Sequence, residues 1–298
     1  MRLMTRPVAL RVLLGLFALL LAGGIAGAGA TPQRGGILEF AVDVQPPNYD
    51  CHANISFTFI DSVAPHYSTL LKFATAEYPT IQGDLAQSWT VSPDHTTYTF
   101  KLRPHVLFHD GSPLTARDVI ASYERIIHPP PGVTSVRRAD YAAIASIDMP
   151  DEHTVVFHLR WPDASMLANF ASPWNCIYSA DRLKLDPLFP KTHVMGSGPF
   201  VFVEHVNGVH WIGRRWDKYY RPGLPYLDGF QADYLTGPAT LQALENGQVL
   251  AQFRSVTPTQ RDALVKSMGD KIVVQSSPWS VALILTFNSR HPPFDDQR

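Results

Sequence analysis

The sequence predicts a mixed α/β fold made of compact lobes, and three observations lead to that prediction. Short segments with alternating apolar residues occur in pairs across turns, which is typical of antiparallel strands. Between them lie segments that open with helix-capping residues and continue with apolar residues at helical spacing. No internal repeat or low-complexity tract interrupts the 298 residues, of which 45% are hydrophobic and 17% charged. That composition is ordinary for a globular chain that buries a large core.

The individual elements follow from these patterns. Residues 96–103 place Tyr98, Phe100 and Leu102 on one face and polar side chains on the other, as expected for a half-buried antiparallel strand. The turn SPDH predicts a hairpin with QSWTV, and MPDEH predicts a second hairpin between YAAIASI and TVVFHLR. Further strands are expected in GGILEFAVDV, at residues 200–206, 209–215 and 229–235, and in KIVVQ and VALILTF. Helices are expected at residues 60–73, from the capping box Thr115–Asp118 to Pro129, at residues 238–246, and from the capping box Thr257–Gln260 to Gly269.

The stretch HVLFHDGSPLTARDVIASY holds the strongest candidates for chemistry. His105 and His109 are four residues apart and Asp110 follows, which could form a metal site or a catalytic pair. On the continuation of a strand, however, residues i and i+4 lie about 13 Å apart, too far for two ligands of one zinc. Asp110-Gly111 is also a turn signal before the capping box. We therefore expect structural roles here, with no catalytic residue, metal or cofactor.

The first thirty residues differ from the rest of the chain. Three arginines precede the apolar run VLLGLFALLLA, and an Ala-x-Ala site ends at Ala30, as in a cleavable secretory signal peptide. A membrane anchor is the alternative, but about eleven strongly apolar residues are fewer than the roughly twenty that a span needs. Gly24 stands where a lipid-attachment motif would need cysteine. Of the 25 basic side chains, 22 then remain against 26 acidic ones, so nucleic acid is not an expected partner.

Cys51 and Cys176 are the two cysteines of the chain. An oxidising compartment outside the cytoplasm permits them to form a disulfide. The alternative is two separate buried thiols, and sequence alone does not supply the geometry that would decide.

The run GDLAQSWTVSPDHTTYTFKLRPHVLFHDGSPLTARDVIASYERI resembles the signature region of the family 5 extracellular solute-binding proteins, the oligopeptide, dipeptide and nickel receptors of ABC importers. RGGILEFAVDVQPPNYD, GSGPFVF, RRWDKYYRPGLPYLDGF, ATLQALENGQV and LTFNSRHPPFDDQR follow the family's order, so that the resemblance covers residues 35–298. Two departures concern the ligand: Tyr49-Asp50-Cys51 replaces a usual Leu-Asp-Pro, and Leu250 stands where an acidic residue is frequent.

The resemblance implies a periplasmic-binding-protein-like fold of type II, a Venus flytrap with mixed sheets. It further implies that the chain holds only the first lobe with an inserted α+β subdomain and ends before a second lobe. The implied divisions are a signal peptide at 1–30, a lobe core at 31–62 and 190–288, the inserted subdomain at 63–189, and a hinge with the start of the missing lobe at 289–298.

The resemblance also implies a function. A receptor of this kind is a periplasmic, monomeric, non-enzymatic protein that closes over a peptide or another small solute and delivers it to an ABC permease in the inner membrane. A non-functional receptor fragment is one alternative, and a periplasmic His/Asp or zinc hydrolase is another. The side chains implied to face the ligand are Asn54, Ser56, Phe57, Tyr141, Ser172, Trp174, Asn175 and Asn288. For each of them, packing or capping is the competing interpretation.

Overall fold

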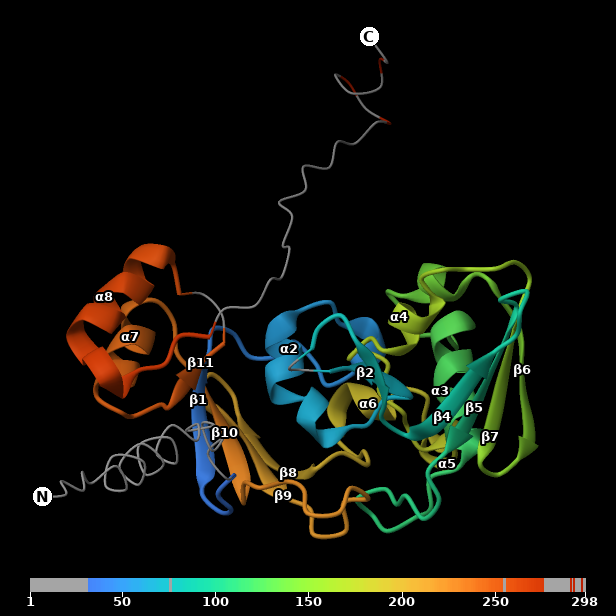
Figure 1. Cartoon of the computed structure of the whole chain (residues 1–298), viewed down its shortest axis with the longest axis horizontal. Helices are drawn as coiled ribbons and strands as arrows, with labels where there is room; N and C mark the ends of the chain where they lie inside the picture. Colours follow the sequence, from blue (N-terminus) through green and yellow to red (C-terminus); the bar gives the residue numbers. More distant parts are fainter. Residues whose placement is uncertain are drawn as a thin grey trace, which may run out of the picture.

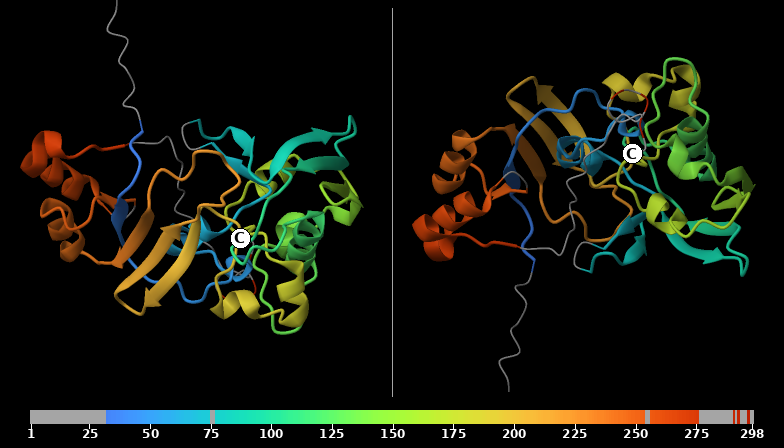
Figure 2. Two further views of the ribbon diagram at one scale, coloured as in Figure 1. Left: turned by 90° about the horizontal axis from the view of Figure 1, so that it is seen from below. Right: turned by 90° about the horizontal axis from the view of Figure 1, so that it is seen from above.

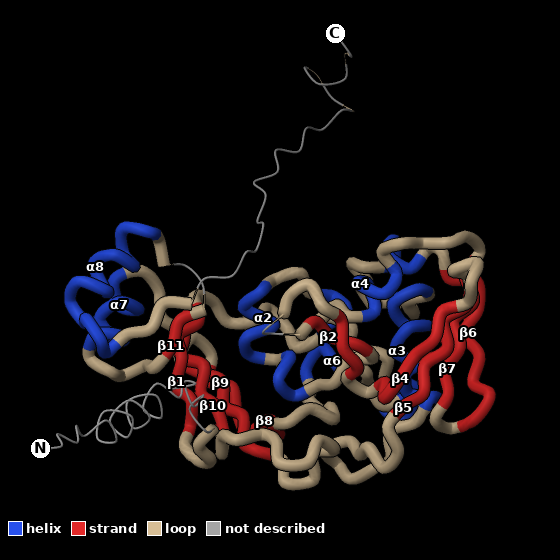
Figure 3. The backbone as a smooth tube through the Cα atoms, in the orientation of Figure 1, coloured by secondary structure: helices blue, strands red, loops and turns tan. Residues whose placement is uncertain are grey.

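The computed structural model describes residues 32–74, 77–253 and 256–275 together with residues 290, 292 and 296. Two sheets lie at opposite ends of the molecule, with a loop-rich region between them (Figures 1 and 3). No helix in these ranges is long and apolar enough to cross a bilayer. The predicted leader at residues 1–30 lies outside the described residues.

The first sheet has five strands in the order β11-β1-β10-β9-β8. β1 pairs in parallel with both β10 and β11, whereas β10, β9 and β8 pair antiparallel. Helices α7 and α8 pack beside this sheet (Figure 2), and their buried side chains meet Ala41 of β1. The elements are β1 (Ile37–Val42), β8 (Phe200–Val206), β9 (His210–Arg215), β10 (Gly229–Tyr234), β11 (Ala251–Gln252), α7 (Pro238–Glu245) and α8 (Pro258–Met268).

The second sheet is antiparallel with the order β4-β5-β7-β6, and helix α3 covers one face of it. Tyr98, Phe100 and Leu102 alternate inward along β5 and are buried. The ring of Tyr123 from α3 meets the ring of Phe157 from β7 at 5.0 Å. The elements are β4 (Ala86–Val91), β5 (Thr97–Leu102), β6 (Ile144–Asp151), β7 (Thr154–Leu159), α3 (Ala116–Ile127), α4 (Met166–Phe170) and α5 (Ala180–Leu185).

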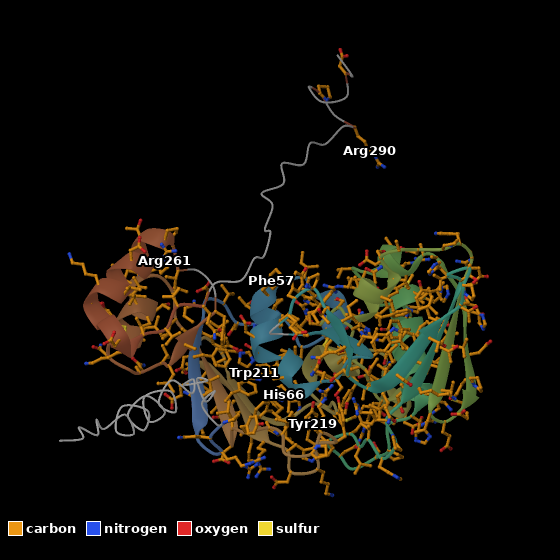
Figure 4. All side chains as sticks on the ribbon, viewed as in Figure 1. Phe57, His66, Trp211, Tyr219, Arg261 and Arg290 are labelled. Atoms are coloured by element: carbon orange, nitrogen blue, oxygen red, sulfur yellow. A yellow bond between two sulfur atoms is a disulfide. The ribbon has the colours of Figure 1, made fainter. Side chains whose placement is uncertain are left out.

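Shorter elements connect the two sheets, and a buried histidine lies among them (Figure 4). The indole of Trp211 donates to Nε2 of His66 at 2.8 Å, and Nδ1 of His66 donates to the carbonyl of Phe200 at 2.7 Å. Both ring nitrogens are therefore used, with the ring neutral. The connecting elements are α2 (Phe57–Ser62), α6 (Phe189–Thr192), β2 (Leu71–Phe73), β3 (Ile81–Gly83) and the 3-10 turns η1 (Cys51–Ala53) and η2 (Ala64–His66). Two further 3-10 turns lie elsewhere, η3 (Arg138–Tyr141) between α3 and β6 and η4 (Gly269–Lys271) directly after α8.

Most sequence-based elements are confirmed, including the mixed α/β class, both hairpins and both capping boxes. The helix predicted over residues 60–73 is wrong beyond Ser62. Pro65 has no backbone N–H to continue the hydrogen bonds of the α-helix, so the chain forms the short turn η2 and then becomes extended at Tyr67. The interval ends in strand β2, where Leu71 is buried against the second sheet.

Two other predictions differ from the structure. Residues 272–275 of KIVVQ form no strand, and Val273 is 83% exposed; β propensity produces a strand only where a neighbouring strand accepts its hydrogen bonds. The strand predicted after Leu102 is also absent, because the chain turns at Pro104-His105, where His105 has a positive φ of 59°. The strand predicted in VALILTF lies outside the described residues.

Candidate ligand-binding site

A disulfide joins the two loops that sequence reasoning assigned to the ligand. Cys51 and Cys176 are 125 residues apart in the chain, their Cα atoms lie 6.0 Å apart and their sulfur atoms are bonded. Both side chains are fully buried. Of the two alternatives left open by the sequence, the structure has the bridged form. The loop that starts α2 and the loop that follows α4 are therefore held side by side.

A buried ionic network supports the first of these loops. Arg125 of α3 donates from Nη2 to Asp50 Oδ2 at 2.6 Å and from Nη1 to Asp50 Oδ1 at 3.1 Å. Tyr178 donates to the same carboxylate and accepts from the backbone N–H of Cys51. His52 accepts from Arg125 through Nδ1 and donates from Nε2 to the carbonyl of Cys176. Burial lowers the pKa of His52 to about 3, so that the ring is neutral.

Aromatic side chains from the two loops meet beside the disulfide. The rings of Phe57 and Trp174 lie 5.3 Å apart at 72°, an edge-to-face arrangement, and both side chains are half-buried. The guanidinium of Arg137 lies 4.6 Å from the centre of the Trp174 ring. Its Nη2 donates to the carbonyl of Asn54 at 2.8 Å. Phe57, at one end of α2, is labelled in Figure 4.

Arg137 was missed by sequence reasoning. It stands in the irregular segment before η3, where no periodicity or motif marks it. Its position becomes evident only when the fold brings residues 54, 137 and 174 together.

Asn54 and Ser56 lie in the same loop, but their side chains are already hydrogen-bonded. The amide of buried Asn54 donates to Asn48 Oδ1 at 2.9 Å and to the carbonyl of Asp50 at 2.8 Å. The hydroxyl of Ser56 is 2.7 Å from the hydroxyl of Thr58. These contacts fix the loop and leave Phe57 to provide its half-exposed surface.

Tyr141 and Asn175 lie below the surface. Both are fully buried, and the Tyr141 hydroxyl donates to the carbonyl of Asn169 at 2.8 Å. Asn175 donates to that hydroxyl and to the same carbonyl, while its backbone N–H donates to the carbonyl of half-buried Ser172. Burial raises the pKa of Tyr141 far above its ordinary value. These hydrogen bonds join Asn175, the residue after Trp174, to η3 and to the end of α4. Asn288 lies outside the described residues.

The histidine-rich stretch forms packing contacts. His109 bonds through Nε2 with the carbonyl of Gly198 at 3.0 Å, and its backbone N–H donates to the carbonyl of Gly196. Asp110 accepts from Ser112 and from Arg182. In the described ranges, no group of three or more His, Cys, Asp or Glu side chains is arranged to hold a metal ion.

An open pocket of about 620 Å³ lies close to these loops, between the C-terminal end of α3, η3 and the start of β6. Tyr141 is the one predicted ligand residue that contributes to it. Its wall includes Arg138 and Arg160, and Arg160 donates to the carbonyls of Ala142 and Ile144. The pocket and the Phe57–Trp174 pair are therefore adjoining but separate features.

With its fold and loops described, the chain can be compared with known proteins. Residues 80–298 match the family described as bacterial extracellular solute-binding proteins, family 5 Middle. The match extends over more than half of the chain, which therefore belongs to that family of solute-binding proteins.

Individual relatives agree with the family. Di/tripeptide-binding protein 2 of Pseudomonas aeruginosa is 28% identical over 297 residues, which span 92% of this chain and 54% of the relative. Among solved structures, AgaA from A. tumefaciens R10 in complex with agropinic acid has a TM-score of 0.66 and 31% identity over 72% of this chain and 43% of its own. AppA from Bacillus subtilis in complex with a nonapeptide has a TM-score of 0.71 and 25% identity over 79% and 47%.

These neighbours are periplasmic binding proteins, and the type II fold expected from the sequence is confirmed. The chain spans about half the length of the curated relatives it matches.

Proposed function

We propose that this chain is the ligand-capturing first lobe of an ABC-importer receptor for a peptide or peptide-like solute. One observation carries the proposal: a curated relative aligned over 92% of the chain is a di/tripeptide-binding protein, and the family match over residues 80–298 includes the Cys176 loop that the disulfide joins to the Cys51 loop. A peptide held by such a lobe is bound through main-chain hydrogen bonds and side-chain surfaces, and this needs no nucleophile. The Phe57–Trp174 pair supplies an apolar surface of that kind.

Receptor closure would couple binding to delivery. A solute that contacts two lobes stabilises the closed state by its greater affinity for that state, and the closed form is the one that would dock on the permease. The receptor would act in the periplasm as a monomer.

The division of the chain is part of the proposal. We assign residues 31–62 and 190–288 to the lobe core, 63–189 to an inserted subdomain, and 289–298 to the hinge and the start of a second lobe. In support, the buried members of the largest apolar cluster all lie between Leu70 and Ile177. The cluster that includes β1 and β10 draws its buried members from both sides of this interval, with Cys176 as the one member from within it.

Calorimetry tests the proposal. The purified chain is titrated with a panel of di- and tripeptides, beside a chimera that adds the second lobe of the P. aeruginosa relative. We expect saturable binding by the chimera and weaker binding by the chain alone, because one lobe offers about half of the contacts. Absence of binding by the chimera to every peptide would contradict a peptide receptor.

Localisation is tested separately. We expect fractionation to place the chain in the periplasm and mass spectrometry to find a mature N-terminus at Thr31. A chain retained in the cytoplasm with residues 1–30 intact would contradict export.

A further inference from the structure

Arg137 is a half-buried cation without a counter-ion in the described parts of the chain. Its Nη2 donates to the carbonyl of Asn54. Its Nη1 is buried and has no hydrogen-bond acceptor among the described residues. No carboxylate of those residues lies within ion-pair distance of it, whereas buried Arg125 and half-buried Arg221 each contact an aspartate.

Because Arg137 is partly buried, its charge without a counter-ion is energetically unfavourable. Burial lowers the pKa of its guanidinium, with Asp140 and Tyr141 acting in the opposite direction. An arginine remains charged in proteins even so, because its ordinary pKa lies far above neutral pH. A desolvated cation needs a partner of opposite charge, and a buried donor without an acceptor destabilises the fold.

A second donor beside Arg137 has the same deficiency. The indole Nε1 of Trp174 is buried without an acceptor in the described residues, and the Trp174 ring lies directly against the guanidinium. The half-exposed rings of Phe57 and Trp174 flank this pair of donors with apolar surface. The arrangement matches a ligand that carries an anion next to an apolar chain.

We propose that Arg137, Trp174 and Phe57 form a subsite for a carboxylate of the solute and for the apolar group attached to it. The proposal rests on the proposed receptor function and adds that the receptor prefers solutes that carry a carboxylate beside an apolar group. On binding, small side-chain movements would expose Nη1 of Arg137 and Nε1 of Trp174 to the carboxylate, while the apolar group covers the two rings. A neutral amide in place of the carboxylate would lose the ion pair with the guanidinium and keep only the weaker attraction between a cation and a neutral acceptor.

The test compares Leu-Leu with its C-terminal amide, two probes that differ in the negative charge. The purified chain is labelled with nitrogen-15, and the indole signals of its six tryptophans are followed during titration at millimolar concentrations. The Trp174 signal is identified by its loss in Trp174→Phe. We expect Leu-Leu to shift that signal saturably and to bind about tenfold more tightly than the amide.

Two variants separate the subsite from general charge effects. Arg137→Gln should weaken Leu-Leu about tenfold and remove the difference between the two probes, whereas Arg137→Lys should keep part of the difference. Arg214→Gln is the matched control, because Arg214 is an exposed arginine on strand β9 of the other sheet; it should behave as the wild type. Thermal unfolding monitors the folding of each variant.

The outcomes distinguish the two proposals. Equal binding of acid and amide, or a difference that persists in Arg137→Gln, overturns the carboxylate subsite and leaves the receptor function standing. If the peptide-binding chimera also fails to bind any peptide by calorimetry, the receptor function is overturned as well. If the chimera binds Leu-Leu by calorimetry but the Trp174 signal does not move, the ligand lies elsewhere and only the subsite proposal is overturned.

Discussion

Arg125 and Asp50 form a buried bidentate ion pair that connects helix α3 to the loop beside the disulfide. Their nitrogen–oxygen distances are 2.6 and 3.1 Å, and each side chain is about 95% or more buried. The same guanidinium also donates to the carbonyl of Pro187. Because the sequence supplies these residues 75 positions apart, the loop geometry depends on the packing of α3.

Removal of this arginine should be strongly destabilising. Arg125→Met leaves the Asp50 carboxylate buried without its counter-ion, which lowers the free energy of unfolding by about 3–5 kcal/mol. Chemical denaturation measures the change. Arg138→Met is the control, since this exposed side chain should change stability by less than about 0.5 kcal/mol. Similar losses in the two variants would contradict the role assigned to the pair.

The disulfide should contribute through the size of the loop it closes. Cys51 and Cys176 are separated by 125 residues, so the chain-entropy model gives a loss of about 4–5 kcal/mol on its removal. Denaturation of the wild type with and without reductant measures this loss. The double variant Cys51→Ser/Cys176→Ser should resemble the reduced wild type and should not respond to reductant. A wild type insensitive to reductant would contradict the prediction.

His66 should make stability depend on pH. Burial lowers its pKa from 6.5 to about 3 in the folded chain, so between these values the unfolded chain binds more protons. Stability therefore falls as the pH drops from 6.5 towards 3, by about 2 kcal/mol between pH 7 and pH 5 for this one group. Denaturation at the two pH values compares the wild type with His66→Gln.

His66→Gln should be less stable than the wild type at both pH values. Its free energy of unfolding should, however, decrease less than that of the wild type from pH 7 to pH 5. His52 remains in both proteins and has the same shift, so the difference between them isolates His66. Parallel pH curves for the two proteins would refute the assignment.

Gly198 is required by a close approach between backbones. A Cβ atom at this position would lie 2.5 Å from the carbonyl carbon of His66 and 2.6 Å from the carbonyl oxygen of Pro65. We expect Gly198→Ala to lower the free energy of unfolding by at least about 2 kcal/mol, because backbone cannot move as easily as a side chain.

The neighbouring residue provides the control for this test. Ser197 is buried, and its hydroxyl has no hydrogen-bond partner in the described chain. Ser197→Ala should therefore be close to neutral in the same denaturation assay. If both variants had the same stability, the close approach would not be limiting.

Local signals in the sequence were sufficient for much of the fold. The alternation that buries Phe100 and the capping box at Thr115 each depend on neighbouring residues, and both are confirmed. The helix prediction for residues 60–73 was wrong because apolar residues over a short interval fit the spacing of a helix and of a strand alike. Only the tertiary contacts of Leu71 determine that this segment ends as a strand.

The candidate site was less accessible to sequence reasoning. The family resemblance pointed to Phe57 and Trp174, which the structure brings into contact. It did not point to Arg137, whose partners Asn54 and Trp174 come from distant segments. Nor could it distinguish Trp174, which is half-exposed, from Asn175, which is fully buried and hydrogen-bonded to Tyr141. Such distinctions arise from long-range packing.

Strand β1 lies between β11 and β10, and this position constrains the order in which the first sheet can form. This strand is made early, yet its parallel neighbours are β10 and β11, and the bond from Gly36 to Asp228 joins residues 192 positions apart. Phe40 and Val42 of β1 therefore stay exposed to solvent until the strands β10 and β11 have emerged. The hairpins of the second sheet can form before that. Strand pairings between residues so distant in the sequence slow folding and prolong the exposure of apolar surface that favours aggregation. If the chain is exported from its N-terminus, we expect chaperones to protect β1 until residue 252 of β11 has emerged.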